Sequence, residues 1–99
     1  MLLIIWEFRI RPAMRQEFEH HYGPHGTWAE FFRQDAAYLG TELLRDARDA
    51  TLYLTLDRWE NAAAFETFKS AHRARYLEID RACKVLTTSE RLLGSYEQL

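Results

Sequence analysis

Cysteine is almost absent from this chain of 99 residues, which contains only Cys83. One cysteine cannot form a disulfide within the chain, and it cannot supply the set of thiolates that binds a structural zinc ion. Chains that contain few cysteines are typical of reducing compartments, where disulfides are rare. We therefore expect a cytoplasmic location and no cysteine-based metal site.

The chain also lacks an excess of charge of either sign. Its 13 basic and 15 acidic residues give a net charge of −2, and they are interspersed along the sequence. Domains that bind nucleic acid usually carry a basic patch, which this sequence does not contain. Glycine is scarce too, and the four glycines form no phosphate-binding loop of the kind that holds a nucleotide or a flavin. The sequence therefore indicates no nucleic-acid partner and no cofactor.

A long hydrophobic run is missing as well. The N-terminal stretch MLLIIWEFRI is apolar only as far as Glu7 and Arg9. It is much shorter than the roughly 20 apolar residues that span a bilayer. It also lacks the basic start and the small-residue cleavage site of a signal peptide. We interpret it as a buried strand, and we expect no membrane association.

The chain does contain enough apolar material, 47% of its residues, for one domain over residues 1–99. Its most regular stretch is TLYLTLDRW, residues 51–59, in which apolar residues alternate with others as they do in a β-strand. One face of that strand carries Leu52, Leu54 and Leu56, and the other carries Tyr53, Thr55, Asp57 and Trp59. A helical pattern follows at once. We expect that helix to cross back over the leucine face of the strand.

The remaining pattern predicts three more strands and two more helical segments, and it sets the start of the helix that follows residues 51–59. Strands are expected at residues 2–11, 38–46 and 91–97, a helix from Pro12 that ends at Gly23, a short helix from a capping box at Thr27, and a long helix after the cap Asn61 with a bend near Ser70. The two strands on either side of residues 46–50 should form an antiparallel hairpin.

The resulting order is β, α, β, β, α, β. With right-handed crossovers this order gives an α+β, ferredoxin-like fold, βαββαβ, in which a four-stranded antiparallel sheet carries its helices on one face. The helix-free face is then expected to present Leu3, Ile5, Tyr53 and Trp59. So large an apolar patch is unusual on a soluble monomer. We therefore expect a homodimer that pairs through this face.

Three stretches carry a resemblance to a known family, namely IIWEFRIRP, the hairpin YLGTELLRD to TLYLTLDRWEN, and the aromatic helix AAFETFKSAH. Together they are similar to the antibiotic biosynthesis monooxygenase-like superfamily of dimeric α/β barrels. The resemblance implies a homodimer in which each subunit has a pocket between its sheet and its helices. It also implies a range of activities, which includes cofactor-free oxygenases of aromatic molecules, heme-degrading enzymes and domains without an assigned activity.

His72 is the candidate catalytic residue, because it lies in an apolar helical stripe between Phe68 and Tyr76. A titratable group is costly in apolar surroundings unless it is hydrogen-bonded. Histidine there can act as a pocket base, or it can be a structural residue at the edge of the domain. His20 and His21 are adjacent and so point about 100° apart on a helix, and Gly23-Pro24 breaks the i, i+4 relation of His21 to His25, so we expect no metal site from these histidines.

The aromatic residues supply the candidate substrate-binding wall for a small aromatic ligand. The residues assigned to it are Trp6, Phe8, Trp28, Phe68 and Tyr76. Heme-degrading relatives share an Asn on the first strand and a Trp on the later helix, and the matching positions here are Phe8 and Phe68, which argues against heme. Two functions stay open. One is a cofactor-independent monooxygenase acting on a quinol-type molecule, with His72 as base, and the other is a non-catalytic binding or regulatory homodimer.

Overall fold

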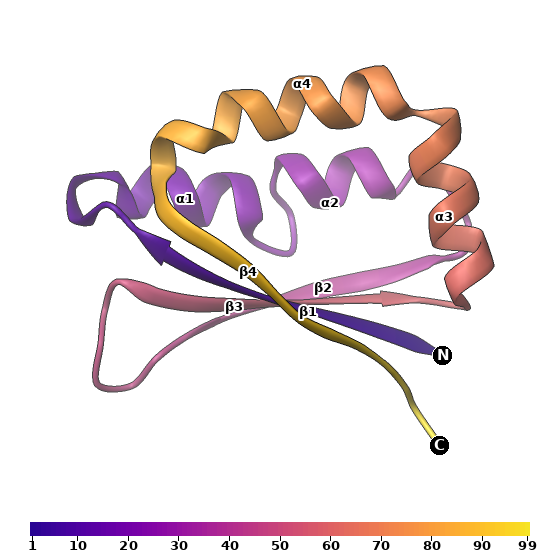
Figure 1. The fold of residues 1–99 in the computed structure, drawn as a ribbon, viewed down its shortest axis with the longest axis horizontal. Helices are drawn as coiled ribbons and strands as arrows, with labels where there is room; N and C mark the ends of the chain where they lie inside the picture. The colour runs from indigo at the N-terminus through magenta and orange to yellow at the C-terminus, as the bar shows by residue number, and fades with distance from the viewer.

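The structure is a computed structural model that describes residues 1–99, and its helices cover one face of a four-stranded sheet (Figure 1). The elements are β1 Leu2–Ile10, a short 3-10 turn η1 Pro12–Met14, α1 Arg15–Tyr22, α2 Thr27–Phe32, β2 Tyr38–Arg45, β3 Leu52–Trp59, α3 Ala62–Ala71, α4 Arg73–Cys83, a second 3-10 turn η2 Lys84–Leu86 and β4 Thr87–Glu97. The strand order is β2-β3-β1-β4, and every neighbouring pair is antiparallel. This confirms the predicted α+β, ferredoxin-like fold. No helix is both long and apolar enough to cross a membrane.

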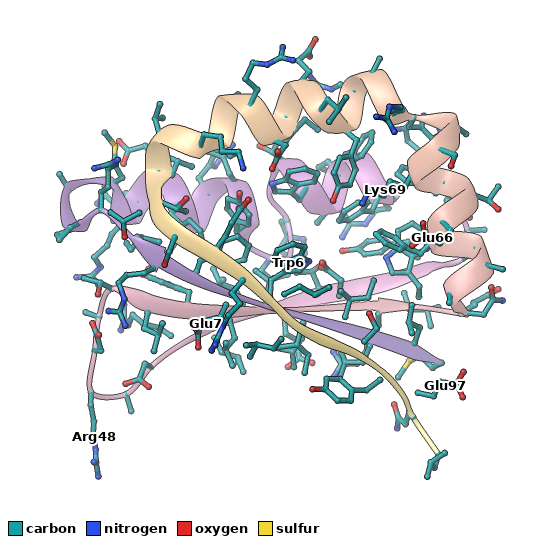
Figure 2. All side chains as sticks on the ribbon, viewed as in Figure 1. Trp6, Glu7, Arg48, Glu66, Lys69 and Glu97 are labelled. Atoms are coloured by element: carbon teal, nitrogen blue, oxygen red, sulfur yellow. The ribbon has the colours of Figure 1, made fainter.

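The register between the two central strands decides which side chains meet the helices. Phe8 of β1 lies opposite Tyr53 of β3, and Trp6 lies opposite Thr55. Residues that are directly opposite in an antiparallel pair project from the same face of the sheet. Figure 2 shows Trp6 between the sheet and the helices, whereas Glu7 projects to the other side of β1. The helix-covered face therefore takes the aromatic residues of both central strands.

The face predicted for β3 is wrong. Tyr53 and Trp59 are 1% and 0% exposed and lie beneath the helices, where the prediction placed the leucines. Leu52, Leu54 and Leu56 are only half-buried and lie on the helix-free face, together with Leu3 and Ile5 as predicted. The error arose because both faces of this strand are apolar, so that alternation alone does not show which face meets the helices.

An aromatic cluster fixes α3 and α2 on the sheet. The Trp59 ring lies 5.6 Å from that of Phe32, 5.3 Å from that of Phe65 and 5.4 Å from that of Phe68, measured between centroids. Tilted and edge-to-face contacts at such separations are the favoured arrangements of aromatic pairs. This packing anchors α2 and α3 on the sheet. Trp6 is not part of the cluster.

The helix ends differ in part from the prediction. Asn61 does cap α3, since its side-chain oxygen accepts a hydrogen bond from the Ala64 amide at 2.8 Å. The predicted bend falls at His72, which separates α3 from α4. The predicted capping box is wrong, because the N-cap residue of α2 is Gly26, and Thr27 is the first helical residue, whose hydroxyl pairs with Nδ1 of His21 at 2.7 Å.

The last strand is longer than predicted. β4 begins at Thr87 and not at Arg91, because Thr87 already pairs with Ile10 at the far end of β1. The predicted strand, residues 91–97, left out the polar run Thr87–Ser89. β4 is an edge strand whose backbone pairs with β1 on one side only, and of these residues Thr88 and Ser89 are exposed whereas Thr87 is buried.

Candidate active site

A cavity of about 70 Å³ lies between the sheet and the helices, and it opens to solvent. It is lined by side chains from all four strands and from three helices: Trp6, Phe8, Tyr22, Trp28, Phe32, Thr41, Thr55, Asp57, Tyr76, Asp80 and Glu90. Six of these residues are aromatic, three are carboxylates, and none is basic. The combination of an apolar wall with a few polar groups is what ligand sites usually show.

The aromatic wall is held together by contacts between helices. Trp28 of α2 packs its ring 5.1 Å from that of Tyr76 on α4 and 6.2 Å from that of Tyr22 on α1. From the sheet, the rings of Trp6 and Phe8 stack at 6.2 Å. Because these rings are held by one strand and three helices that pack on one another, the wall is largely preformed.

Asp57 supplies the carboxylate among these rings. It projects from β3 beside Thr41 of β2, whose hydroxyl donates to Asp57 Oδ1 at 2.5 Å. The Tyr38 hydroxyl in turn lies 2.5 Å from Thr41 Oγ1. A hydroxyl has one proton, so while Thr41 donates to the carboxylate it can only accept from Tyr38. One carboxylate oxygen is thereby occupied, and Oδ2 has no hydrogen-bond partner within the protein.

The surroundings make this carboxyl unusually basic. Removal from water raises the pKa of Asp57 from its ordinary 3.8 to about 6, and the hydrogen bond from Thr41 opposes that shift. No Lys, Arg or His lines the cavity to offset the desolvation. Burial likewise raises the pKa of the neighbouring Tyr76 to about 12. At neutral pH Asp57 is therefore an ionised base that takes a proton readily, whereas the Tyr76 phenol stays protonated.

Two further carboxylates, those of Asp80 and Glu90, lie where the cavity meets solvent. Asp80 of α4 and Glu90 of β4 line the cavity while their side chains keep 34% and 28% of their surface exposed. The ammonium group of Lys84 lies 2.9 Å from a Glu90 oxygen and 3.6 Å from an Asp80 oxygen. The Lys84 side chain, from the turn η2, thus forms ion pairs with one carboxylate of α4 and one of β4.

The structure brings together four of the six residues predicted for the site. Trp6, Phe8, Trp28 and Tyr76 all line the cavity, and their assignment to substrate binding stays a prediction. Phe68 does not line it, because its ring is 2% exposed and packs in the core against Trp59.

His72 is also absent from the cavity wall. It ends α3 and precedes α4, and its ring lies 4.4 Å from that of Phe68 and 6.0 Å from that of Phe31. The histidines near the N-terminus form no metal-binding group either, since no three His, Cys, Asp or Glu side chains cluster suitably. The position of His72 gives no support to its predicted role as a base.

The residue that the sequence analysis missed is Asp57. Its signal was present, because an aspartate alternates with Tyr53, Thr55 and Trp59 on one face of β3. A carboxylate on a face that is otherwise buried is a candidate functional group. That inference was not available while the leucine face was taken as the buried one.

Comparisons with known proteins agree with this geometry. SnoaB, a cofactor-independent oxygenase from Streptomyces nogalater, superposes with a TM-score of 0.81 at 20% identity, over 98% of this chain and 91% of SnoaB. Protein PA3566 from Pseudomonas aeruginosa superposes with a TM-score of 0.70 at 19% identity, over 99% of this chain and 93% of its own. At such identities these likenesses show the fold alone. No curated protein sequence matches significantly.

The family assignment comes from the sequence model of the antibiotic biosynthesis monooxygenases, which matches residues 1–77. That range includes three of the four strands, β1, β2 and β3, together with the helices α1, α2 and α3 and the start of α4. It contains every cavity residue except Asp80 and Glu90. The chain belongs to the antibiotic biosynthesis monooxygenase family.

Proposed function

We propose that this protein is a cofactor-independent monooxygenase for a small hydroxylated aromatic molecule of the quinol type, with Asp57 as its general base. The observation that carries the proposal is a carboxylate with a free oxygen and a pKa raised to about 6, set among six aromatic side chains. Membership of a monooxygenase family supports the reaction class. The assignment of the base to Asp57 replaces the earlier prediction of His72.

Asp57 meets the chemical needs of a base in this reaction. A general base works best when its pKa lies near the working pH, because it is then ionised yet still strong enough to take a proton. An ordinary aspartate is too weak a base at neutral pH, and desolvation in the cavity raises the pKa of Asp57 to about 6. The unpaired Oδ2 is the atom that would accept the proton, since Thr41 occupies Oδ1.

The proposed reaction balances without an added cofactor. Asp57 takes the proton of a ring hydroxyl, and the resulting quinolate gives one electron to dioxygen. The radical pair joins at the neighbouring ring carbon, and the peroxide formed there receives a proton. The O–O bond then breaks, the ring carbon loses its hydrogen, and water leaves. Quinol and dioxygen thus give a hydroxyquinone and one water.

The size of the cavity restricts the substrate. About 70 Å³ is roughly half the volume of an engineered cavity that binds benzene, which is about 150 Å³. A single ring therefore enters only by displacing lining side chains or by leaving part of itself in the mouth. A one-ring quinol with a side chain directed at the opening fits this shape better than a fused polycyclic molecule.

We also infer a homodimer from the helix-free face. Leu3, Ile5, Leu54 and Leu56 meet there around the β1–β3 ladder, and Leu44 is 44% exposed beside them. Ion pairs border this patch, such as Glu7 with Arg91 and Glu42 with Arg58. An apolar centre with a charged rim is the usual anatomy of a stable interface between subunits. A second copy, sheet against sheet, would cover it.

Oxygen uptake tests the proposed reaction. Methylhydroquinone and other alkylhydroquinones are incubated with the native protein and with the variants Asp57→Asn and Glu60→Gln. Glu60 is an exposed carboxylate beyond the cavity, so its variant makes the same charge change elsewhere. We expect catalysed uptake by the native protein and the control, and a loss of about 10²–10⁴-fold with Asp57→Asn.

Two results would contradict the proposal. Full activity of Asp57→Asn would remove Asp57 as the base. Saturable binding of quinols without any uptake of oxygen above the uncatalysed rate would favour the second hypothesis, a non-catalytic binding homodimer.

A further inference from the structure

The charge around the cavity carries an inference about the substrate. Asp57 lies within the cavity and Asp80 and Glu90 at its mouth, and the other titratable lining groups are the phenols of Tyr22 and Tyr76. The one cation in contact with these carboxylates is Lys84. When all of them are ionised, three negative charges face one positive charge, a sum of −2 over these four residues.

We propose that the cavity selects its substrate by charge, and that the substrate is a phenol or quinol whose side chain ends in a protonated amine. This inference rests on the proposed function for the identity of the reacting ring. Its own support is the lining, which combines electron-rich rings with carboxylates and contains no basic group. An aromatic ligand that ends in a carboxylate or a phosphate would meet like charge at both ends of the site.

The carboxylates at the mouth already bind one ammonium group, that of Lys84. The Lys84 ammonium bridges Glu90 and Asp80 at 2.9 and 3.6 Å, so that the two carboxylates converge on one primary ammonium group. An ammonium on a substrate has the same donors and the same charge. It would share or take over these contacts while its ring points inward toward Asp57.

The aromatic wall favours the same ligand. The rings of Trp28 and Tyr76 lie 5.1 Å apart beside the mouth residues of α4. A cation over the face of Trp or Tyr is attracted by the ring, and the attraction grows when water is excluded. An ammonium group held at the mouth beside these rings is therefore stabilised by them, whereas an anion is not.

The carboxylate of Asp57, inside the cavity, distinguishes this site from a cluster of acidic residues on the surface. Asp57 is largely shielded from bulk water and lines the cavity, and its Oδ2 has no hydrogen-bond partner in the protein. A group in that state requires a hydrogen-bond donor from a ligand or from water. A phenolic hydroxyl supplies the donor, so the two ends of the proposed ligand match the two acidic parts of the cavity.

Three phenols of nearly equal shape test the proposal, because they differ mainly in charge. Tyramine carries an ammonium, para-propylphenol a methyl group and phloretate a carboxylate at the same position of the side chain. Binding is measured with the native protein at pH 7.5 by the fluorescence of Trp6 and Trp28, and by NMR. We expect tyramine to bind tightest and phloretate at least about tenfold more weakly than para-propylphenol. Added salt should narrow the differences.

Two variants at the mouth sharpen the result. Lys84→Met removes the competing ammonium and should strengthen tyramine binding several-fold while para-propylphenol changes little. Glu90→Gln should weaken tyramine and improve phloretate. Glu60→Gln makes the same charge change outside the cavity and should alter neither ligand.

Several outcomes would overturn the proposal. Phloretate binding as tightly as para-propylphenol would show that the cavity does not select by charge. Tyramine binding no tighter than para-propylphenol would remove the amine, and so would failure of all three ligands to bind. Failure of the proposed function gives a different result, because a protein that prefers tyramine in binding but consumes no oxygen with the alkylhydroquinones would retain the charge selection and lose the oxygenase.

Discussion

The unfolding stability of Asp57→Asn gives a test of the raised pKa that needs no substrate. In the native protein the pKa of Asp57 is about 6, whereas in the unfolded chain it returns to the ordinary 3.8. Between these values the folded protein holds a proton that the unfolded chain has released. Stability therefore falls as the pH rises through this window, and the loss is complete above about pH 6.

The size of the effect follows from the two pKa values. A difference of about two units corresponds to roughly 3 kcal/mol at 1.36 kcal/mol per unit. Since Asp57 faces a cavity that opens to solvent, this is an upper value. Between pH 4 and pH 7.5 the expected loss is about 2 kcal/mol, because part of the titration of the unfolded chain lies below pH 4.

Urea unfolding of the native protein and of Asp57→Asn is compared at both pH values and at equal protein concentration. The other carboxylates titrate alike in the two proteins, so their contributions cancel in the difference. We expect Asp57→Asn to gain about 2 kcal/mol on the native protein between pH 4 and pH 7.5. A difference that does not change with pH would refute a raised pKa for Asp57, and with it the assignment of the base.

Three further predictions concern the hydrogen bond, the core and the interface. Thr41→Val removes the donor to the ionised carboxylate, so a carbon NMR titration should show the pKa of Asp57 rising further above its ordinary value. Thr41→Ser keeps a hydroxyl and should restore the native pKa. An unchanged pKa in Thr41→Val would count against the hydrogen bond. Phe68→Ala should destabilise by about 3–5 kcal/mol in urea unfolding, and a loss below about 1 kcal/mol would show that the ring is not in the core. Leu54→Glu places an unpaired charge on the helix-free face and should give a monomer by light scattering, whereas a native protein that is already monomeric at micromolar concentration would contradict the dimer.

The strand pattern and the cap at Asn61 could be predicted because they depend on neighbouring residues. Alternation in residues 51–59 and a capping side chain three residues before the amide it accepts from are local signals. The choice of face is not local. It depends on which side the helices cover, and on β3 the leucines and the aromatic residues were both suitable for burial.

The base could not be predicted for the same reason. Asp57 gains its properties from Thr41, which lies on another strand, and from helices that close over it. His72 looked favourable because it was placed on one apolar helical face between Phe68 and Tyr76. The break at His72 ends that face, so the ring packs against Phe31 and Phe68 and not in the cavity.

Strands β2 and β3 carry residues of both the site and the proposed interface. Thr41 and Asp57 project toward the cavity, whereas the next residue on each strand, Glu42 and Arg58, forms an ion pair on the helix-free face. β2 is an edge strand that pairs only with β3, so its position depends on that ladder and on whatever covers the sheet. A second copy over the leucine face would restrain the edge and keep the Thr41 hydroxyl within reach of Asp57. We therefore expect the variant Leu54→Glu also to show a higher pKa for Asp57 than the native protein does, although position 54 lies outside the cavity. An unchanged pKa in a folded monomer would show that the two faces of the sheet act independently.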